Sequence, residues 1–554
     1  METVALATVM LVLSAVPAGA SPLPEKPPAA PEVMNVLKTA PFTGEPYELR
    51  GKRIVFTDYY FIRPGVLLWL NDKGKYVNTD KEPVYGPYDV HLERPSSPYG
   101  IEIVTQPAQG RELLEPQRPW EKNGVRFFSV LQDGETYKAW GACDPGGACY
   151  FESKDGIHWD RPKLGLKDFE GSKDNNLLAG GPAGCVFVDP HGPPEERYKS
   201  VGTMELTWEQ FQAFRMKYPD RWENRAIEAH GGETAIMAIR GAVSPDGINW
   251  TLLPDPFTVE KSDGQQVGYY DPGLKEYVVF VRNWWAGSRS ERWTWDGRET
   301  WQGEKHGSGR RSIGRMVSRD FREFGLSENV IVPMPGDMSA TEVLYLNTYT
   351  TIPSAPDNHL MLPTIWDTRD DTTSIGLWSS ADGILWGKVP GPRLFETAAF
   401  GEPDGGAVFG FPGLIERADG SFALAYEGHN LPHKYPRALR QIRGGFIVWP
   451  KGRIVAVEAR EAGEFTTVGI MPPGRKLRIN ALTKRAGGIR VEIATLLDEP
   501  LPGHTFDDCD VVQGDQFWTP VTWNGTGDLG FKDGQPIIIR FKMERAKLFG
   551  IEFD

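Results

Sequence analysis

One short motif occurs four times along the chain and constrains the fold more than any other feature. It reads Ser-x-Asp-Gly-x-x-Trp at residues 153–159, 244–250 and 380–386, and a degenerate copy ending in Phe324 occurs at 318–324. Successive serines are 91, 74 and 62 residues apart. A repeat of this length that keeps a turn and an aromatic residue is typical of a β-propeller, whose four-stranded sheets, or blades, surround an axis.

The residue types of the motif fit a tight turn at the edge of a blade. Glycine accepts the positive φ that such turns require. Ser and Asp side chains can satisfy the amides of the turn, and we expect the Trp to wedge between neighbouring blades. A single copy would predict only a surface turn, whereas four copies in order predict a repeating fold.

The chain between the motifs divides into five blocks with a strand–turn–strand pattern. Their first strands are predicted at residues 53–62, 184–189, 267–271, 342–349 and 413–417. Asp189-Pro190 and Asp271-Pro272 follow their strands and are interpreted as hairpin turns. Five blocks predict an all-β chain with a five-bladed propeller over residues 45–460. Short strands with Pro-Gly turns then predict a C-terminal β-sandwich over residues 461–554.

The first 44 residues differ in amino-acid composition from the rest of the chain. An apolar run, Val4 to Val16, precedes Ala18-Gly19-Ala20, which predicts a signal peptide over residues 1–20 with cleavage before Ser21. A buried N-terminal strand is the alternative. Residues 21–44 are rich in Pro, Ala and Lys and are predicted to be a linker. No later stretch is long enough to span a bilayer, so we expect a secreted or periplasmic protein without a transmembrane segment.

Charge and cysteine content limit the classes of partner. A net charge of −13 argues against nucleic acid and anionic membranes, and it is compatible with a neutral sugar. Of the four cysteines, Cys143 and Cys149 flank a short turn and either close a disulfide in an oxidising compartment or remain free thiols. No Cys/His spacing suggests zinc, and neither a metal nor a cofactor is predicted. The sequence does not indicate an oligomeric state.

Several stretches resemble the five-bladed propeller glycosidases, the superfamily of invertases, levansucrases and arabinanases. They are residues 188–199, 311–320, 432–436 and 503–510, together with the repeated turns and the terminal sandwich. The chain is most similar to a secreted group, related to glycoside hydrolase family 32, in bacteria such as planctomycetes. The resemblance implies a five-bladed propeller that cleaves glycosidic bonds.

The chain departs from family 32 at the motifs that carry catalysis. The Asn-Asp-Pro-Asn-Gly nucleophile motif, the Arg-Asp-Pro motif and the Glu-Cys acid motif of the invertases do not occur. The resemblance therefore speaks to the fold and leaves the substrate and the catalytic residues open. Two hypotheses follow: a glycoside hydrolase acting on an oligo- or polysaccharide, and a non-catalytic propeller that binds carbohydrate or protein.

Glycoside cleavage requires two carboxyl groups, one acidic and one ionised. In propeller glycosidases these groups lie at the start of the innermost strands and converge on the axis. Asp58, Asp263 and Glu342 meet this test and are the predicted catalytic residues, with Glu342 as the general acid because its strand is mostly apolar. Each residue also has a structural alternative. Asp58 could face outward or cap its strand, Asp263 could be a simple turn residue, and Glu342 could have a buried structural role.

Five further residues are predicted to bind the substrate. Arg282 could pair with a carboxylate or bind a sugar hydroxyl, although a structural salt bridge explains it equally well. Gln266 lies beside Asp263, and Glu427 and His429 end a strand of the fifth block. Trp285 lies in a Trp-rich segment, and its ring could stack on a sugar or pack between blades.

Overall fold

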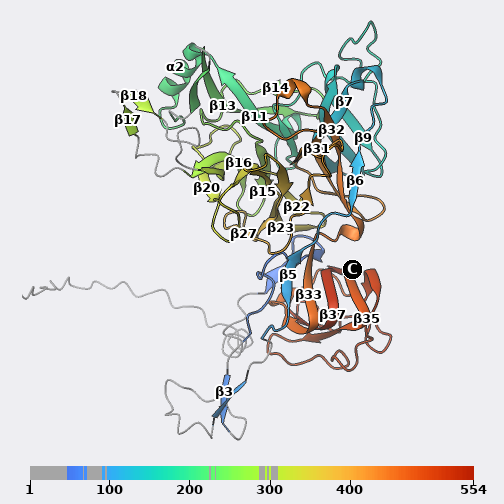
Figure 1. Cartoon of the computed structure of the whole chain (residues 1–554). Coiled ribbons are helices and arrows are strands. Elements are labelled where there is room, and N and C mark those ends of the chain that lie inside the picture. Colours follow the sequence, from blue (N-terminus) through green and yellow to red (C-terminus); the bar gives the residue numbers. More distant parts are fainter. Residues whose placement is uncertain are drawn as a thin grey trace, which may run out of the picture. The chain divides into compact units, whose positions relative to one another are not determined.

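The computed structural model describes residues 46–65, 68–71, 90–93, 97–223, 226–230, 233–285, 293–295, 298–300 and 310–554. The predicted signal peptide and linker, residues 1–44, lie outside the described residues. Residues 45–554 form one compact unit, and its secondary structure is almost entirely β (Figure 1). In the described part the α-helical element is α2 (Trp208–Lys217), which starts at a capping box on Thr207.

Five blades follow one another along the chain, each a sheet of three to five strands except blade IV, which has two sheets. The strands of the first three blades are antiparallel to their neighbours and follow the sequence order, except that β12 pairs outside β13 in blade II. Blade I contains β7 (Gly124–Asp133), β8 (Thr136–Asp144) and β9 (Gly147–Ser153). Blade II contains β10 (Cys185–Val188), β11 (Tyr198–Leu206) and β13 (Glu233–Ser244), with β12 (Ile227–His230) and β14 (Thr251–Leu252) both paired to β13. Blade III contains β15 (Val267–Asp271), β16 (Glu276–Trp285), β19 (Arg310–Ser318) and β20 (Glu328–Ile331).

Blade IV consists of two short sheets that continue one another. One contains β21 (Glu342–Leu346), β24 (Thr364–Asp367), β25 (Thr373–Ile375) and β28 (Phe395–Glu396). The other contains β22 (Tyr349–Ile352), β23 (Ala355–Met361), β26 (Trp378–Ser380) and β27 (Gly387–Lys388). The amide of Leu362 donates to the carbonyl of Thr348 at 2.8 Å across the break, so the two sheets form one interrupted blade.

Blade V is completed by a strand from the other end of the propeller sequence. Its order is β29 (Ala407–Gly410), β31 (Phe422–His429), β32 (Ile442–Trp449) and β6 (Gly110–Leu113), with β30 (Ile415–Glu416) also on β31. The early strand β6 pairs antiparallel with β32, Gly110 opposite Val448. This pairing closes the ring of blades without an unpaired sheet edge at the junction.

The four Ser-x-Asp turns share one hydrogen-bonding pattern. In each, the Asp Oδ1 accepts two backbone N–H groups at 2.8–2.9 Å and the Ser hydroxyl at 2.8–3.0 Å. The residue after the Asp has a positive φ, 72°, 79° and 69° for Gly156, Gly247 and Gly383 and 60° for Phe321 in the degenerate copy. The turn chemistry predicted from the sequence is therefore confirmed at all four positions.

The aromatic residue that ends each turn packs against the preceding blade. The ring pairs are Trp159 with Phe446 at 5.9 Å, Trp250 with Trp140 at 6.5 Å, Phe324 with Phe257 at 4.4 Å and Trp386 with Phe280 at 5.7 Å. The first pair joins blade I to blade V, so the contacts run around the ring. The predicted wedge role of these residues is confirmed.

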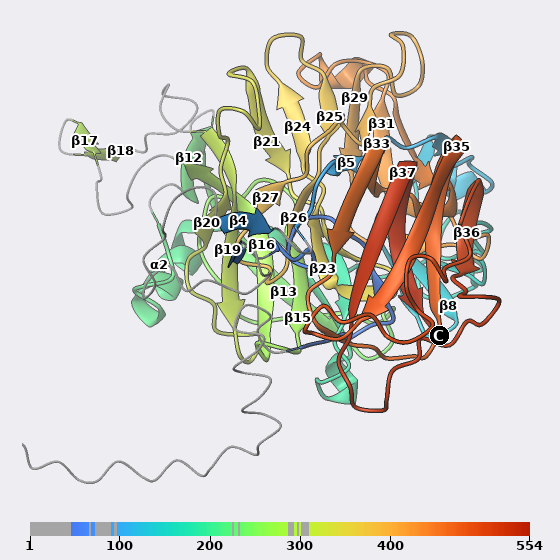
Figure 2. The same ribbon diagram turned by 90° about the horizontal axis from the view of Figure 1, so that it is seen from below.

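The C-terminal β-sandwich is built on three long strands that lie side by side (Figure 2). Its largest sheet has the order β36 (Asp515–Pro520), β35 (Leu477–Ala494), β37 (Ile538–Phe553), β33 (Val455–Thr466) and β5 (Glu102–Thr105). The two-stranded hairpins β3 (Leu68–Asn71)–β4 (Val90–Glu93) and β17 (Trp293–Trp295)–β18 (Arg298–Thr300) complete the described strands.

The segment predicted as the first propeller strand, residues 53–62, belongs to the sandwich instead. Its strand β2 (Arg53–Ile54) pairs with β37, and the nearby β1 (Tyr47–Glu48) pairs with β34 (Ile470–Met471). The prediction of its place was wrong because an apolar strand is equally suited to any buried sheet, and the partner lies about 500 residues away in the sequence. Blade I begins at Gly124.

Propeller and sandwich share buried contacts within the unit of residues 45–554. The guanidinium of Arg53 binds Glu416 of β30 at 3.0 Å and Glu552 of β37 at 2.7 Å, and it is almost fully buried. These contacts join the two parts within one compact unit, which has no separate boundary near residue 460. The domain boundary predicted at residue 460 therefore remains a prediction. In the described residues no helix is long and apolar enough to cross a membrane.

The cysteines divide into one pair and two separate thiols. Cys143 and Cys149, at facing ends of β8 and β9, form a disulfide. This result chooses between the two interpretations that the sequence left open. Cys185 and Cys509 are free and buried, and burial raises the pKa of Cys185 to about 12.

Candidate functional site

A cavity of about 510 Å³ opens where the innermost strands of all five blades meet, and we call it the axial cavity. The contributing residues include Phe128 of β7, Cys185 of β10, Gln265 and Gln266 ahead of β15, Tyr345 of β21 and Phe409 of β29. The β31 end and the loop after it supply Glu427, His429, His433 and Arg440.

Glu427 is a carboxylate held from two sides. Its Oε1 lies 3.1 Å from Nε2 of His429, and its Oε2 lies 3.4 Å from Nε of Arg126 on β7. Burial acts to raise the pKa of Glu427, but the hydrogen bond from His429 and the charges of Arg126 and Arg440 outweigh it and hold the pKa below its ordinary value. Glu427 is therefore ionised at neutral pH.

His429 connects Glu427 to Arg440. Its Nδ1 lies 3.4 Å from Nη1 of Arg440. Because a carboxylate can only accept and a guanidinium can only donate, this chain assigns the ring proton to Nε2, which donates to Glu427. The ring of Phe409 lies 5.0 Å from that of His429 and fixes its plane. Both residues predicted to bind substrate at this strand end, Glu427 and His429, therefore lie in the axial cavity.

Two arginine guanidinium groups and one histidine ring surround the aromatic ring of Tyr345. The guanidinium groups of Arg282 and Arg311 lie 4.5 and 4.7 Å from its ring centroid. The ring of His433 meets it edge-on at 4.5 Å. Cation–π attraction stabilises such contacts by roughly 0.5–2 kcal/mol each. Tyr345, which lines the cavity, therefore has two guanidinium groups and an imidazole ring packed around its own ring.

Asp263 lies one residue before the cavity and is bound to Arg282. The guanidinium of Arg282 donates to Asp263 Oδ1 and, from Nε, to the carbonyl of Tyr345 at 3.0 Å. Burial acts to raise the pKa of Asp263, and the charges of Arg282 and Arg311 lower it below its ordinary value. Arg282 therefore takes the structural ion-pair role that the sequence left open beside substrate binding.

Glu342 starts β21 but lies outside the lining of the axial cavity. Its Oε1 accepts from Nη2 of Arg393 at 2.7 Å and its Oε2 from the amide of Ser339 at 2.8 Å. Both partners belong to blade IV and the loop ahead of it. The carboxylate is thus committed to an ion pair within its own blade.

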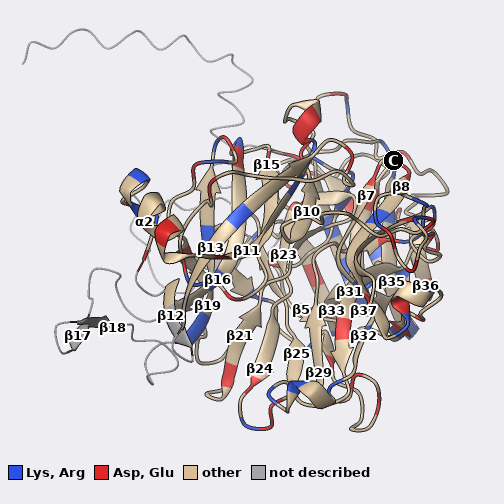
Figure 3. Cartoon of the chain, turned by 90° about the horizontal axis from the view of Figure 1, so that it is seen from above, with Lys and Arg blue, Asp and Glu red and all other residues tan. Residues whose placement is uncertain are grey.

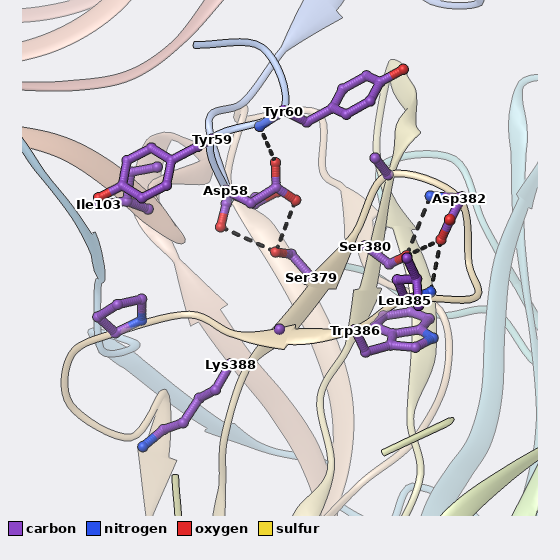
Figure 4. Close-up of a pocket in the computed structure, with 14 residues that line it drawn as sticks. Asp58, Tyr59, Tyr60, Ile103, Ser379, Ser380, Asp382, Leu385, Trp386 and Lys388 are labelled. Carbon is purple, nitrogen blue, oxygen red and sulfur yellow. Dashed lines mark hydrogen bonds between the residues drawn. The ribbon is translucent and has the colours of Figure 1, made fainter. Parts of the chain in front are cut away.

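Asp58 lies in a different cavity, of about 740 Å³ (Figure 4). Its Oδ1 accepts from the amide of Tyr60 at 2.8 Å, and its Oδ2 accepts from the hydroxyl of Ser379 at 3.2 Å. The other walls come from the turn of blade IV, with Asp382, Trp386 and Lys388. The structure therefore does not bring Asp58, Asp263 and Glu342 into one cavity.

Two further predicted binding residues have distinct surroundings. Gln266 lines the axial cavity, and its amide donates to the carbonyl and hydroxyl of Ser262 at 3.0 and 2.9 Å. Trp285 ends β16 with 47% of its surface exposed, opposite Arg310 in the strand ladder. Within the described residues, no group of three His, Cys, Asp or Glu side chains is placed to hold a metal ion.

Sequence reasoning did not single out Arg126, His433 and Arg440. Arg126 lies in β7, a blade strand that the repeat pattern did not reveal. His433 falls within the stretch 432–436 that carries the family resemblance, and Arg440 follows seven residues later, so their proximity to Glu427 in the sequence was the available signal.

No family model and no curated protein matches the sequence. Among solved structures the chain is similar to a glycoside hydrolase, with 14% identity over 62% of this chain and 92% of that one and a TM-score of 0.36. It is also similar to an N-acetylgalactosamine deacetylase from F. plautii, with 13% identity over 63% of this chain and 95% of that one and a TM-score of 0.36. A GH32 β-fructofuranosidase of Bombyx mori is similar with 10% identity over 81% of this chain and 95% of that one and a TM-score of 0.33. Likeness at this level does not identify an activity, and the five-bladed fold is established by the strand pairing itself.

Proposed function

We propose that the protein is a glycoside hydrolase that cleaves an oligo- or polysaccharide in the axial cavity. The observation that carries the proposal is Glu427, a carboxylate kept ionised by His429, Arg126 and Arg440 inside a cavity lined from all five blades. A glycosidase needs one ionised carboxylate to act as nucleophile or base next to the sugar carbon. Glu427 fills that role in this proposal.

The remaining walls suit a sugar. Tyr345, Phe409 and Phe411 supply aromatic surface to the cavity, and Gln265 and Gln266 supply amides. Aromatic rings pack against the apolar face of a sugar, and amides can both donate to and accept from its hydroxyl groups. A volume of about 510 Å³ is within the range of small-ligand sites.

Hydrolysis also needs a carboxyl group that is protonated when the reaction begins. Asp263 and Glu427 both have lowered pKa values and do not meet this requirement in the free protein. The sequence assigned that role to Glu342, and this assignment remains a prediction. The ionised state of Glu427 in the cavity and of Asp263 next to it favours a second candidate function, a propeller that binds carbohydrate without cleaving it.

Turnover by matched variants tests the proposal. Release of reducing ends from a panel of plant and algal polysaccharides and aryl glycosides is measured for the wild type, Glu427→Gln and Glu402→Gln, whose side chain is exposed. We expect Glu427→Gln to lose at least ~100-fold in kcat while Glu402→Gln stays at the wild-type rate, because the missing charge no longer stabilises the transition state. Saturable glycan binding with no turnover on any substrate would establish the second candidate instead.

Glu342→Gln tests the predicted general acid in the same assays. An acid is needed most where the leaving group is poor, so the prediction is a loss on unactivated glycosides and little loss on aryl glycosides with good leaving groups. If Glu342→Gln kept the wild-type rate on both substrate classes, Glu342 would not be the general acid.

The predicted site of action is outside the cell or in the periplasm. N-terminal sequencing of the exported protein is expected to begin near Ser21, after Ala18-Gly19-Ala20. A cytoplasmic product that retains Met1 would contradict this prediction.

A further inference from the structure

Two buried donors in the axial cavity lack an acceptor. His433 is only 9% exposed, lines the cavity, and has no hydrogen-bond partner at either ring nitrogen. Nε of Arg440, also at the cavity, is buried without a partner as well. Buried polar groups are nearly always paired in folded proteins, so these atoms are groups that a ligand would satisfy. A neutral imidazole still carries one N–H, and a guanidinium carries only donors.

The surroundings of His433 are positively charged. Burial, more than any other cause, lowers the pKa of His433 to about 3, and the charges of Lys434, Arg440 and Arg311 act in the same direction. Asp371 is the acidic neighbour of this loop, and it accepts the amide of Lys434 at 2.6 Å. The ring is therefore neutral at physiological pH in a field set by cations.

The carboxylates in and next to the cavity already have partners. Glu427 binds His429 and Arg126, and Asp263 binds Arg282. Neither is a described partner of the His433 ring or of Nε of Arg440. An anionic group brought by the ligand would accept from both of these donors and would also be attracted by the neighbouring cations. A neutral hydroxyl could also accept from these donors, but it would gain no charge attraction from the neighbouring cations.

A second wall suits hydroxyl groups rather than charge. The carbonyl oxygen Oε1 of Gln265 lines the cavity, is buried and has no partner, while its Nε2 donates to the carbonyl of Asn347 at 2.7 Å. The free atom is an acceptor, which a sugar hydroxyl can satisfy as a donor. The cavity thus offers an acceptor on the blade III side and donors on the blade V side.

We propose that the axial cavity selects a sugar bearing an anionic group, a carboxylate or a sulfate ester, which binds His433 and Arg440 while a hydroxyl of the same sugar binds Gln265. The inference rests on the proposed function in taking the ligand to be a glycan. It goes beyond that function because it names the substrate class as acidic glycans. Carboxylate and sulfate share the acceptor chemistry, and the experiment below separates them.

Binding is measured by titration calorimetry with three oligosaccharide sets: oligouronides, the same oligosaccharides with the carboxyl reduced to an alcohol, and sulfated neutral oligosaccharides. We expect one of the anionic sets to bind at least ~10-fold more tightly than the carboxyl-reduced set, since charge-assisted hydrogen bonds are about twice as strong as neutral ones. Tight binding of the first set identifies a carboxylate, and tight binding of the third identifies a sulfate.

Two variants and a control locate the anion. Arg440→Met and His433→Leu are each expected to reduce the preference for the anionic set to less than ~3-fold, because each removes one of the two donors. Arg437→Met changes an exposed arginine of the same loop and is expected to keep the wild-type preference. Two variants are used so that a folding defect in one, detected by its thermal unfolding, leaves the other as the test.

The inference is overturned if the carboxyl-reduced set binds as tightly as both anionic sets, if nothing binds, or if both folded variants keep the preference. Its failure is distinguishable from failure of the proposed function. Anion-selective binding without turnover would support the inference and contradict the proposed hydrolase function. Turnover of neutral glycans that is lost in Glu427→Gln would support the hydrolase function and contradict the inference.

Discussion

Two buried histidines show how surroundings set the chemistry of single residues in this protein. Burial lowers the pKa of His359 to about 4, and its Nδ1 lies 2.8 Å from the Tyr349 hydroxyl. Burial and the cations Lys434, Arg440 and Arg311 lower the pKa of His433 to about 3. His359 belongs to the propeller core, whereas His433 lies at the axial cavity. Both rings remain neutral in the folded protein at pH values where an unfolded chain would protonate them.

His433 makes the stability of the protein depend on pH. Between pH 6.5 and about 3 the unfolded chain binds a proton at this residue and the folded protein does not, so the free energy of unfolding falls as the pH falls. In His433→Gln this contribution disappears. Between pH 7 and pH 5, urea unfolding of the variant is expected to show a smaller loss of stability than the wild type, by on the order of 2 kcal/mol.

The control for this prediction is His191→Gln, which changes an exposed histidine. It should reproduce the wild-type dependence on pH. An equal loss of stability in wild type and His433→Gln would show that the ring at residue 433 is not kept neutral by the fold.

At the level of elements, each Ser-x-Asp turn has two roles: it ends a pair of strands, and its aromatic residue packs against the neighbouring blade. The turn is local, because its hydrogen bonds join residues two or three positions apart. The wedge is long-range, because Trp386 reaches Phe280 of the neighbouring blade. The degenerate copy keeps the positive φ with Phe321, whose ring is fully buried against Phe187, Phe257 and Tyr277. Core packing there offsets the backbone strain that glycine avoids elsewhere.

Gly383→Ala tests the turn. Gly383 has φ of 69°, and an added Cβ would lie 2.7 Å from the Tyr269 hydroxyl. Positive φ costs a non-glycine residue about 1–2 kcal/mol, and the close contact adds to this. We expect the free energy of unfolding to fall by roughly 1–3 kcal/mol in chemical denaturation.

Gly387→Ala is the matched control, four residues further along, where an added Cβ meets nothing within 4 Å. Its stability is expected to stay within about 0.5 kcal/mol of the wild type. If Gly383→Ala were no less stable than Gly387→Ala, the turn would not depend on its left-handed glycine.

At the scale of the whole molecule, the N-terminal part of the described chain completes structures that lie later in the sequence. Strand β6 closes blade V, while β2 and β5 extend the sandwich sheet, so that the blue β5 lies beside the orange β33 (Figure 1). Arg53 binds blade V and the sandwich at once through Glu416 and Glu552. Acidic and basic positions are interspersed over the blades (Figure 3), and the cations Lys434, Arg440 and Arg311 act on His433.

Removal of residues 1–113 is expected to prevent stable folding. It deletes β6, β2 and β5 together, which leaves β32 without its outer partner and β33 and β37 each without a neighbour. Removal of residues 1–44 takes away none of the described strands, and this shortened chain should unfold at the temperature of the full-length protein. Thermal unfolding followed by circular dichroism distinguishes the two, and a cooperative transition at the wild-type temperature for the chain lacking 1–113 would contradict the closure.

The part of the fold that could be predicted is the part carried by local patterns. The repeated turn needs glycine, serine and aspartate within seven residues, so its copies predicted the propeller and the positions of the wedges, while the five strand–turn–strand blocks predicted the number of blades. Gln266 lines the axial cavity just ahead of a predicted first strand, and Glu427 and His429 line it at the end of a predicted strand of the fifth block. The assignment of residues 53–62 to a blade failed, since an apolar run contains no information on which distant sheet it joins.

The sequence by itself therefore determined the class of fold, the five-fold repeat and the β-rich C-terminal part, because short-range backbone and turn preferences act within a few residues. Only the tertiary structure decided which strand begins blade I, which one closes blade V and that Asp58 lies in a cavity apart from Glu427. It also decided the charge of the cavity. A net charge of −13 sums over the whole chain, whereas a ligand responds to side chains within a few ångströms. Folding places Arg311, which is more than 100 residues away in the sequence, on the same Tyr345 ring as His433.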